Sequence, residues 1–245
     1  MEKRQEKLHA LPEDSSAHHR RKRDVRLLIL SDIHGQQKKV ILLHKVIDEY
    51  KPSVLTVCGD LTHFGDLTMA STILRVLVGN GIPTLFVPGN CDPMELASMP
   101  TVEGATNLHG RCFTTSGLNF IGVGGSATGP FQTPFELLED QISQILSEAA
   151  RKCLMNHAMV LVSHEPPKET KVDTTFFRQH VGSRAVRSFI EDREPILAIC
   201  GHIHEARGID TIGMTTIVNP GPLHRNQYAL VELNEKVTVQ LEALR

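Results

Sequence analysis

The chain has 245 residues, 40% of them hydrophobic and 22% charged, with a formal net charge of −2 when histidine is neutral. This balance is ordinary for a globular protein, and the small net charge excludes a generally polyanion-binding chain. Trp is absent and aromatic residues make up 4%, so we do not expect an aromatic platform for single-stranded nucleic acid. No apolar run approaches the ~20 residues of a membrane-spanning helix, so we expect no membrane partner.

Residues 1–24 are polar and carry a basic run over 18–23. Their composition favours a disordered basic tail in front of the folded part. A basic arm that contacts nucleic acid is the alternative. Deletion of residues 1–23 without effect on activity or nucleic-acid affinity would eliminate that alternative.

The folded part begins with VRLLILSDIHG, residues 25–35. Four consecutive apolar residues at 27–30 predict a strand that is buried on both faces. Asp32 and His34 follow, and such groups are costly to bury without partners. Both are good ligands for first-row metal ions, so the end of this strand is a candidate metal site.

The same order of apolar strand, small residue and candidate ligand recurs along the chain. A helix over 38–50 precedes a strand over 53–57, which leads into Gly59 and Asp60. A helix over 66–78 precedes a strand over 83–87, which leads into Gly89, Asn90, Cys91 and Asp92. We expect the glycines at the strand ends to let the backbone turn sharply.

The second half of the chain repeats this pattern. A strand over 118–123 is followed by Thr133, Pro134 and Glu136, the N-cap, N1 and N3 of a helix expected to reach about residue 152. A strand over 159–162 leads into His164, and a helix over 184–193 precedes a strand over 195–199 that leads into His202 and His204. Short strands over 215–218, 228–233 and 237–241 close the fold.

Strands that alternate with helices indicate an α/β fold, and without an internal linker we expect one domain over 25–245. Ligands in such sheets bind beyond the carboxyl ends of the strands. The seven candidate metal ligands all lie there: Asp32, His34, Asp60, Asn90, His164, His202 and His204. This set is too large for one ion that keeps an open position and suits two ions, which can together activate water against a phosphoester. Mixed imidazole and carboxylate ligands favour Mn, Fe, Zn or Ni over Ca.

The motifs D-x-H, G-D, G-N-x-D, H and G-H-x-H, in this order between Asp32 and His204, resemble the calcineurin-like metallophosphoesterase superfamily. The resemblance implies a four-layer α/β/β/α sandwich and two divalent metal ions. It places Asp32, His34 and His204 on one ion, Asn90, His164 and His202 on the other, and Asp60 between them. It also implies that a metal-bridging hydroxide attacks the phosphorus of a phosphodiester. A phosphomonoesterase or nucleotidase, and a non-catalytic metal-binding scaffold of the same fold, are the alternatives.

The fourth motif departs from that superfamily, in which most members have G-N-H-D and the histidine is thought to protonate the leaving group or hold a substrate oxygen. The G-N-C-D form with Cys91 resembles a small branch of predicted phosphoesterases related to the bacterial cyclic-AMP phosphodiesterase. A neutral thiol is a poor substitute for an imidazolium, so we expect activated aryl esters to react best. The resemblance makes five residues candidate catalytic groups: Asp60, Asn90, Cys91, Asp92 and His164.

Other features stay open at this level. His63 either reaches substrate or caps the next helix, His224 and Arg225 either line the rim or are solvated, and Glu165 either orients a ligand or is exposed. The five cysteines, Cys58, Cys91, Cys112, Cys153 and Cys200, do not resemble a disulfide framework, so we expect a reducing, cytoplasmic location. We expect a small phosphoester or nucleotide as substrate and no nucleic-acid partner, because a basic groove is not evident. Self-association as a homo-oligomer is left open.

Overall fold

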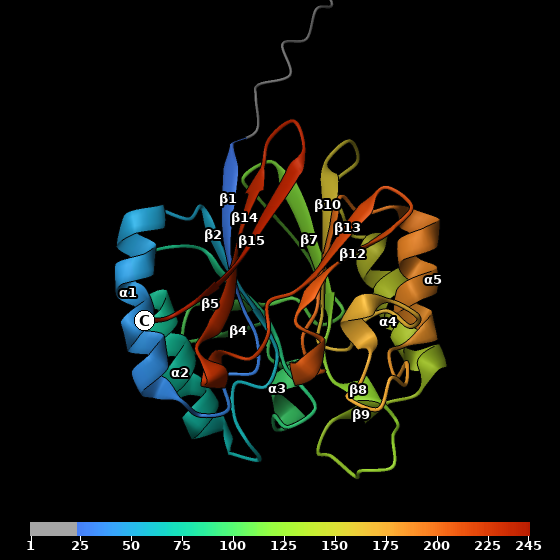
Figure 1. Cartoon of the computed structure of the whole chain (residues 1–245), viewed down its shortest axis with the longest axis horizontal. Helices are drawn as coiled ribbons and strands as arrows, with labels where there is room; N and C mark the ends of the chain where they lie inside the picture. Colours follow the sequence, from blue (N-terminus) through green and yellow to red (C-terminus); the bar gives the residue numbers. More distant parts are fainter. Residues whose placement is uncertain (1–23) are drawn as a thin grey trace, which may run out of the picture.

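The structure, a computed structural model, describes residues 24–245 (Figure 1). The predicted basic tail therefore lies outside the described residues except for Asp24. The helices are α1 (Gln37–Tyr50), α2 (Leu67–Val78), α3 (Glu95–Ser98), α4 (Glu139–Ala150) and α5 (Arg184–Arg193), with 3-10 turns η1 (Lys171–Asp173), η2 (His204–Ala206) and η3 (Leu223–Arg225). The strands are β1 (Val25–Leu30), β2 (Val54–Cys58), β3 (Thr84–Val87), β4 (Thr101–Val102), β5 (Ala105–Asn107), β6 (Cys112–Thr115), β7 (Leu118–Val123), β8 (Ser126–Ala127), β9 (Glu136–Leu137), β10 (Ala158–Ser163), β11 (Leu197–Ile199), β12 (Gly208–Ile212), β13 (Thr215–Asn219), β14 (Gln227–Leu233) and β15 (Val237–Ala243).

Two large sheets lie face to face between two layers of helices. The first sheet has the strand order β15-β14-β1-β2-β3-β5-β4, and the second has the order β12-β13-β11-β10-β7-β6. Helices α1 and α2 cover the first sheet, on the left of Figure 1, and α4 and α5 cover the second, on the right. This arrangement confirms the predicted α/β/β/α sandwich.

Three apolar clusters fill the spaces between the four layers, and β1 shows why its run of apolar residues is needed. Leu28 and Leu30 pack toward α1 and α2, while Leu27 and Ile29 pack between the sheets. All four side chains are fully buried. Side chains alternate across a strand, so a strand in the middle of this sandwich must be apolar on both faces.

Parallel pairing brings the carboxyl ends of the central strands to one end of the molecule. In the first sheet β1, β2 and β3 are parallel neighbours, and in the second β7, β10, β11 and β13 are parallel neighbours. The loops after β1, β2, β3, β10 and β11 are those that carry the seven candidate ligands.

The helix predicted to begin at Pro134 starts later than expected. The Thr133 backbone N–H donates to Glu136 Oε1 at 2.8 Å, as in a capping box, but the Thr133 hydroxyl donates to the same oxygen at 2.8 Å instead of accepting from the Glu136 backbone. The chain then continues as the short strand β9, which pairs with β8, and α4 begins only at Glu139. The local hydrogen bonds therefore form a turn, and the pairing with β8 overrides the helical tendency.

The prediction that the cysteines form no disulfide is wrong for two of them. Cys112 on β6 and Cys153 after α4 form a disulfide, with Cα atoms 5.4 Å apart and a sequence separation of 41 residues. Cys58, Cys91 and Cys200 are free and buried. A pairing between two distant cysteines cannot be inferred from spacing alone, because it depends on the folded geometry. The cytoplasmic location stays a prediction.

No helix within residues 24–245 is long and apolar enough to cross a membrane.

Candidate metal centre

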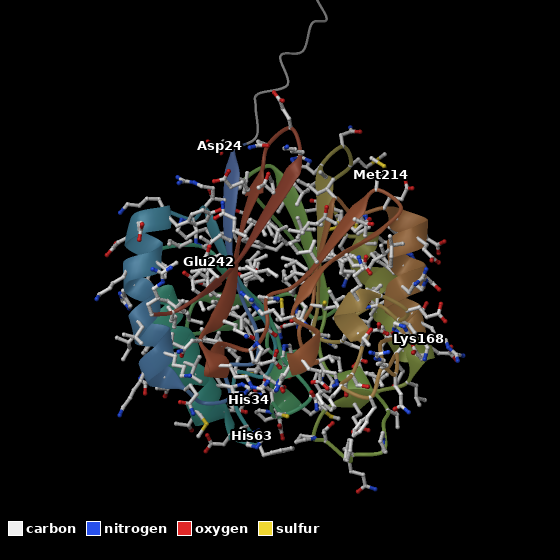
Figure 2. All side chains as sticks on the ribbon, in the orientation of Figure 1. Asp24, His34, His63, Lys168, Met214 and Glu242 are labelled. Carbon is white, nitrogen blue, oxygen red and sulfur yellow. A yellow bond between two sulfur atoms is a disulfide. The ribbon has the colours of Figure 1, made fainter. Side chains whose placement is uncertain are left out.

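The candidate ligands gather where the ends of the two sheets meet. The backbone N–H of Asp32 donates to Gly59 O at 3.1 Å, which ties the loop after β1 to the loop after β2. The backbone N–H of His202 donates to Asp32 Oδ2 at 3.2 Å, which joins the second sheet to the first. His34 and His63 lie at this lower end of the molecule in Figure 2.

Four of the predicted ligands form a first donor group. The Nε2 atoms of His34 and His204 are 3.3 Å apart, and His204 Nε2 lies 3.2 Å from Asp32 Oδ1. His34 Nε2 lies 4.0 Å from Asp32 Oδ1 and 3.7 Å from Asp60 Oδ2. Donors bound at about 2.0–2.2 Å to one ion are about 3–4.3 Å from each other, so these atoms fit around a single cation.

A second donor group lies on the other side of Asp60. His164 Nε2 is 2.9 Å from Asn90 Oδ1 and 3.5 Å from Asp60 Oδ1. His164 Nδ1 lies 2.6 Å from Cys58 O and donates to that carbonyl, so Nε2 is the nitrogen available to bind a cation. The ring of His202 lies 5.0 Å from the ring of His164. Asp60 therefore directs one carboxylate oxygen toward each group.

Burial and charge act in opposite directions on the carboxyl groups. Burial raises the pKa of Asp60 to about 7, although a positive charge on His164 acts to lower it. Burial acts in the same sense on Asp32, but a hydrogen bond with His204 and the charges of His164 and His204 hold its pKa below the ordinary value. The centre thus concentrates negative charge that a cation would neutralise.

The histidines divide into two classes. Burial lowers the pKa of His34 to about 4 and that of His202 to about 3, so both are neutral donors at pH 7. Burial also disfavours the charged form of His164, but the carboxylates of Asp60 and Asp32 together raise its pKa. A cation that binds here would replace the proton on His164, because metal binding and protonation compete for the same nitrogen.

The backbone of the centre is locally strained. The non-glycine residues Asp32, Asp60 and His202 have φ of 51°, 49° and 65°, in the left-handed region that side chains rarely adopt. The predicted sharp turn at a glycine is seen at Gly59, which has φ of 87°. Gly201 is needed for space instead, because a Cβ there would overlap the Ser31 hydroxyl.

Cys91 and Asp92, two of the candidate catalytic residues, are both buried but have different neighbours. Cys91 is 8% exposed, and burial together with the neighbouring Asp60 raises the pKa of its thiol. Asp92 is fully buried. Its carboxylate accepts from the backbone N–H groups of Gly89, Leu61 and Thr62 and from the Thr62 hydroxyl, at 2.7–3.1 Å. These bonds hold together the loops that carry Asp60 and Asn90, and the catalytic role of Asp92 stays a prediction.

The structure shows where His63 and His224 lie, two residues whose roles the sequence leaves open. His63 does not cap α2, because Asp66 does so by accepting from Met69 N at 2.9 Å, and the His63 ring instead lies 5.1 Å from that of His34. The ring of His224 lies 4.9 Å from the His34 ring and 4.8 Å from the His204 ring. Donor atoms of these last three histidines lie within 4.8 Å of one another. No local motif around His224 indicates this contact, which depends on the turn η3.

Glu165 is buried rather than exposed. Burial raises its pKa to about 8, and its Oε2 lies 3.7 Å from His202 Nε2. The same carboxyl oxygen accepts from Ala127 N at 3.3 Å. Glu165 is thus placed to orient His202, which is the first of the two roles considered for it.

Two facing sheets with metal donors at their strand ends define a metallophosphoesterase-type α/β/β/α sandwich. The chain belongs to the calcineurin-like phosphoesterase family, whose model matches residues 25–206. The family implies divalent metal ions, and the two donor groups supply candidate ligands for them.

Individual relatives agree with this membership. The chain is 38% identical over 204 residues to the uncharacterized protein MJ1162 of Methanocaldococcus jannaschii, in a match that covers 81% of this chain and 88% of that protein. It shares its fold with the protein TT1561 of Thermus thermophilus, at a TM-score of 0.74 and 18% identity over 91% of this chain and 100% of that one. A dimetal phosphatase from Danio rerio has the same fold at a TM-score of 0.60 and 11% identity, over 90% and 96% of the two chains.

Proposed function

We propose that the chain is a dinuclear-metal-dependent hydrolase of small phosphodiesters. The observation that supports this most directly is the position of Asp60, whose two oxygens lie 3.7 Å from His34 Nε2 and 3.5 Å from His164 Nε2. One carboxylate between two donor groups is the arrangement needed to hold two cations side by side. Mn is our first choice of ion, and Fe, Zn or Ni also suit the donors.

Bound cations would supply the positive charge that activates water and stabilises the charge developing on a phosphoryl group. The chain's own residues hold the donors in place for this role. Cys58 O fixes the tautomer of His164, Glu165 faces His202, and Asp92 fixes the loops after β2 and β3. The rings of His63 and His224 flank that of His34, and in this proposal both donate hydrogen bonds to a phosphoryl oxygen.

A preference for esters with good leaving groups is part of the proposal. Cys91 places a thiol beside Asp60, where an imidazolium would be a stronger proton donor. Aryl diesters, whose leaving groups need little protonation, should therefore react faster than alkyl diesters.

The test compares hydrolysis of bis-p-nitrophenyl phosphate and p-nitrophenyl phosphate with Mn added, alongside a measurement of bound metal. Faster turnover of the diester supports the proposal, and faster turnover of the monoester favours a phosphomonoesterase. Tight metal binding without hydrolysis of either favours a scaffold, as this fold also occurs in the anchor protein GAP50 of Plasmodium, at a TM-score of 0.60 and 14% identity.

A matched pair of variants makes the test specific. Asp60→Asn removes one negative charge from the centre and should lower turnover at least about 100-fold. Asp48→Asn makes the same chemical change on α1, where the side chain is 81% exposed, and should leave turnover unchanged. Equal activity of the two variants would contradict the proposed role of Asp60.

A further inference from the structure

Four of the nine phenylalanines expose more than half of their surface. The exposed fractions are 56% for Phe64, 80% for Phe131, 83% for Phe176 and 82% for Phe177. We call these four residues the aromatic rim. Phenylalanine is normally among the most buried residues, and exposed apolar groups that gather around a site indicate a binding surface.

The loops that carry the aromatic rim are each fastened to the candidate metal centre. Phe64 N donates to Cys91 O at 3.1 Å. Phe135 N, at the end of the loop that holds Phe131, donates to Asn90 O at 3.1 Å. Phe176 N donates to Oε1 of Glu205, the residue after His204, at 3.0 Å. Three separate loops are thus held beside the donor groups, two by backbone–backbone hydrogen bonds and the third by the side chain of Glu205.

Ring contacts lead from the metal centre to Phe64 of the aromatic rim, and two other members of the rim contact each other. The ring of Phe64 lies 4.9 Å from that of His63, which lies 5.1 Å from that of His34. Phe176 and Phe177 contact each other edge to face at 5.9 Å. A substrate held at the donor groups would therefore need to extend only two rings outward to contact an exposed phenylalanine.

We propose that the aromatic rim binds an apolar aryl or alkyl group of the substrate, which makes the substrate class phosphodiesters with an apolar ester substituent. This inference rests on the proposed function. The rim selects the ester group that stays on the phosphoryl product, while the donor groups act on the phosphorus. Burial of that group against the phenylalanines makes the free energy of substrate binding more favourable in proportion to its buried apolar surface, and KM falls as a result.

The experiment compares methyl p-nitrophenyl phosphate with phenyl p-nitrophenyl phosphate, which share one leaving group and differ in the other ester. In the parent protein we expect kcat/KM for the phenyl ester to be about tenfold higher, chiefly through KM. The double variant Phe176→Ser and Phe177→Ser should lose most of this ratio while keeping the methyl-ester rate. The corresponding double Leu variant should restore about half of it.

Met214 provides the control, because it is 88% exposed and lies at the opposite end of the molecule from His34 (Figure 2). Met214→Ser should leave the ratio unchanged. An unchanged ratio in the double Ser variant would overturn the inference, as would an equal loss for both substrates. The inference would also be overturned, in favour of a membrane-contacting surface, if the double Ser variant lost the binding of the parent protein to phosphatidylcholine vesicles but kept the phenyl-to-methyl ratio of kcat/KM.

A binding measurement separates this inference from the proposed function. If the parent protein hydrolyses neither ester, the proposed function fails, and calorimetry with phenylphosphonate and methylphosphonate on the Mn-loaded protein decides the inference. Tighter binding of phenylphosphonate that the double Ser variant loses supports the rim. Equal affinity of the two phosphonates in the parent protein overturns it.

Discussion

Replacement of Asp92 by Ala tests whether this carboxylate holds the metal-site loops together. The change would leave three buried backbone N–H groups, those of Gly89, Leu61 and Thr62, without their acceptor. The Thr62 hydroxyl keeps Cys91 O as an alternative partner at 3.3 Å. An unsatisfied buried donor costs about 1–3 kcal/mol, and water that enters the new space recovers part of this, so we expect a loss of about 4 kcal/mol in the free energy of unfolding.

Asp92→Asn is the matched variant, because it keeps the shape and one acceptor oxygen. Its amide group would face Thr62 N–H, so we expect a smaller loss of about 2 kcal/mol. Urea unfolding followed by far-ultraviolet circular dichroism gives both values, since the chain has no Trp. A loss below about 1 kcal/mol for Asp92→Ala would refute the positioning role. A stable Asp92→Ala protein that has lost only turnover would support the predicted catalytic role instead.

Three further changes have defined outcomes. Cys91→His should raise turnover of an alkyl diester by supplying a better proton donor, and an unchanged or lower rate in a steady-state assay would contradict this. Removal of divalent cations by EDTA should lower the Tm by about 5–10 °C, because a ligand at 100 times its Kd stabilises by about 2.7 kcal/mol, and Mn should restore the Tm in a thermal scan. His109, whose Nδ1 accepts from Gly124 N at 2.9 Å, has its pKa lowered by burial to about 4. The unfolded chain therefore binds more protons below pH 6.5, and stability falls from pH 6.5 to 4 by at most about 3 kcal/mol, at about 1.4 kcal/mol for each pH unit. His109→Asn should remove this part of the pH dependence, and urea midpoints that still fall as steeply would contradict the assignment.

Much of the fold could be predicted because the structure that each segment favours locally is also the one that the sandwich requires. The strand over 118–123 and the helix over 184–193 have the predicted bounds, and α2 ends at Val78 as predicted but begins one residue later, after Asp66 as its N-cap. In each of these elements the apolar period matches the face that the sandwich buries. The helix predicted from Pro134 fails because Thr133 and Glu136 form only one of the two capping-box hydrogen bonds, and sequence alone does not show that β8 offers a partner to the next residues.

In the candidate centre, too, some features could be predicted from the sequence and others could not. Its seven side chains could be placed together because parallel strands bring their carboxyl ends to one edge. The contacts of Asp92, His63 and His224 could not be predicted, since they depend on the direction in which each side chain leaves its loop. The pairing of Cys112 with Cys153 depends likewise on where β6 and the end of α4 lie in space.

The donors come from both sheets, with Asp32, His34, Asp60 and Asn90 after strands of one and His164, His202 and His204 after strands of the other. The centre therefore exists only while the two inner layers stay in contact. A fluctuation that parts them would dismantle the donor groups in the same motion, without any change within either sheet. Amide hydrogen exchange at the inward-facing residues of β1 and β10 would then slow together when cations bind.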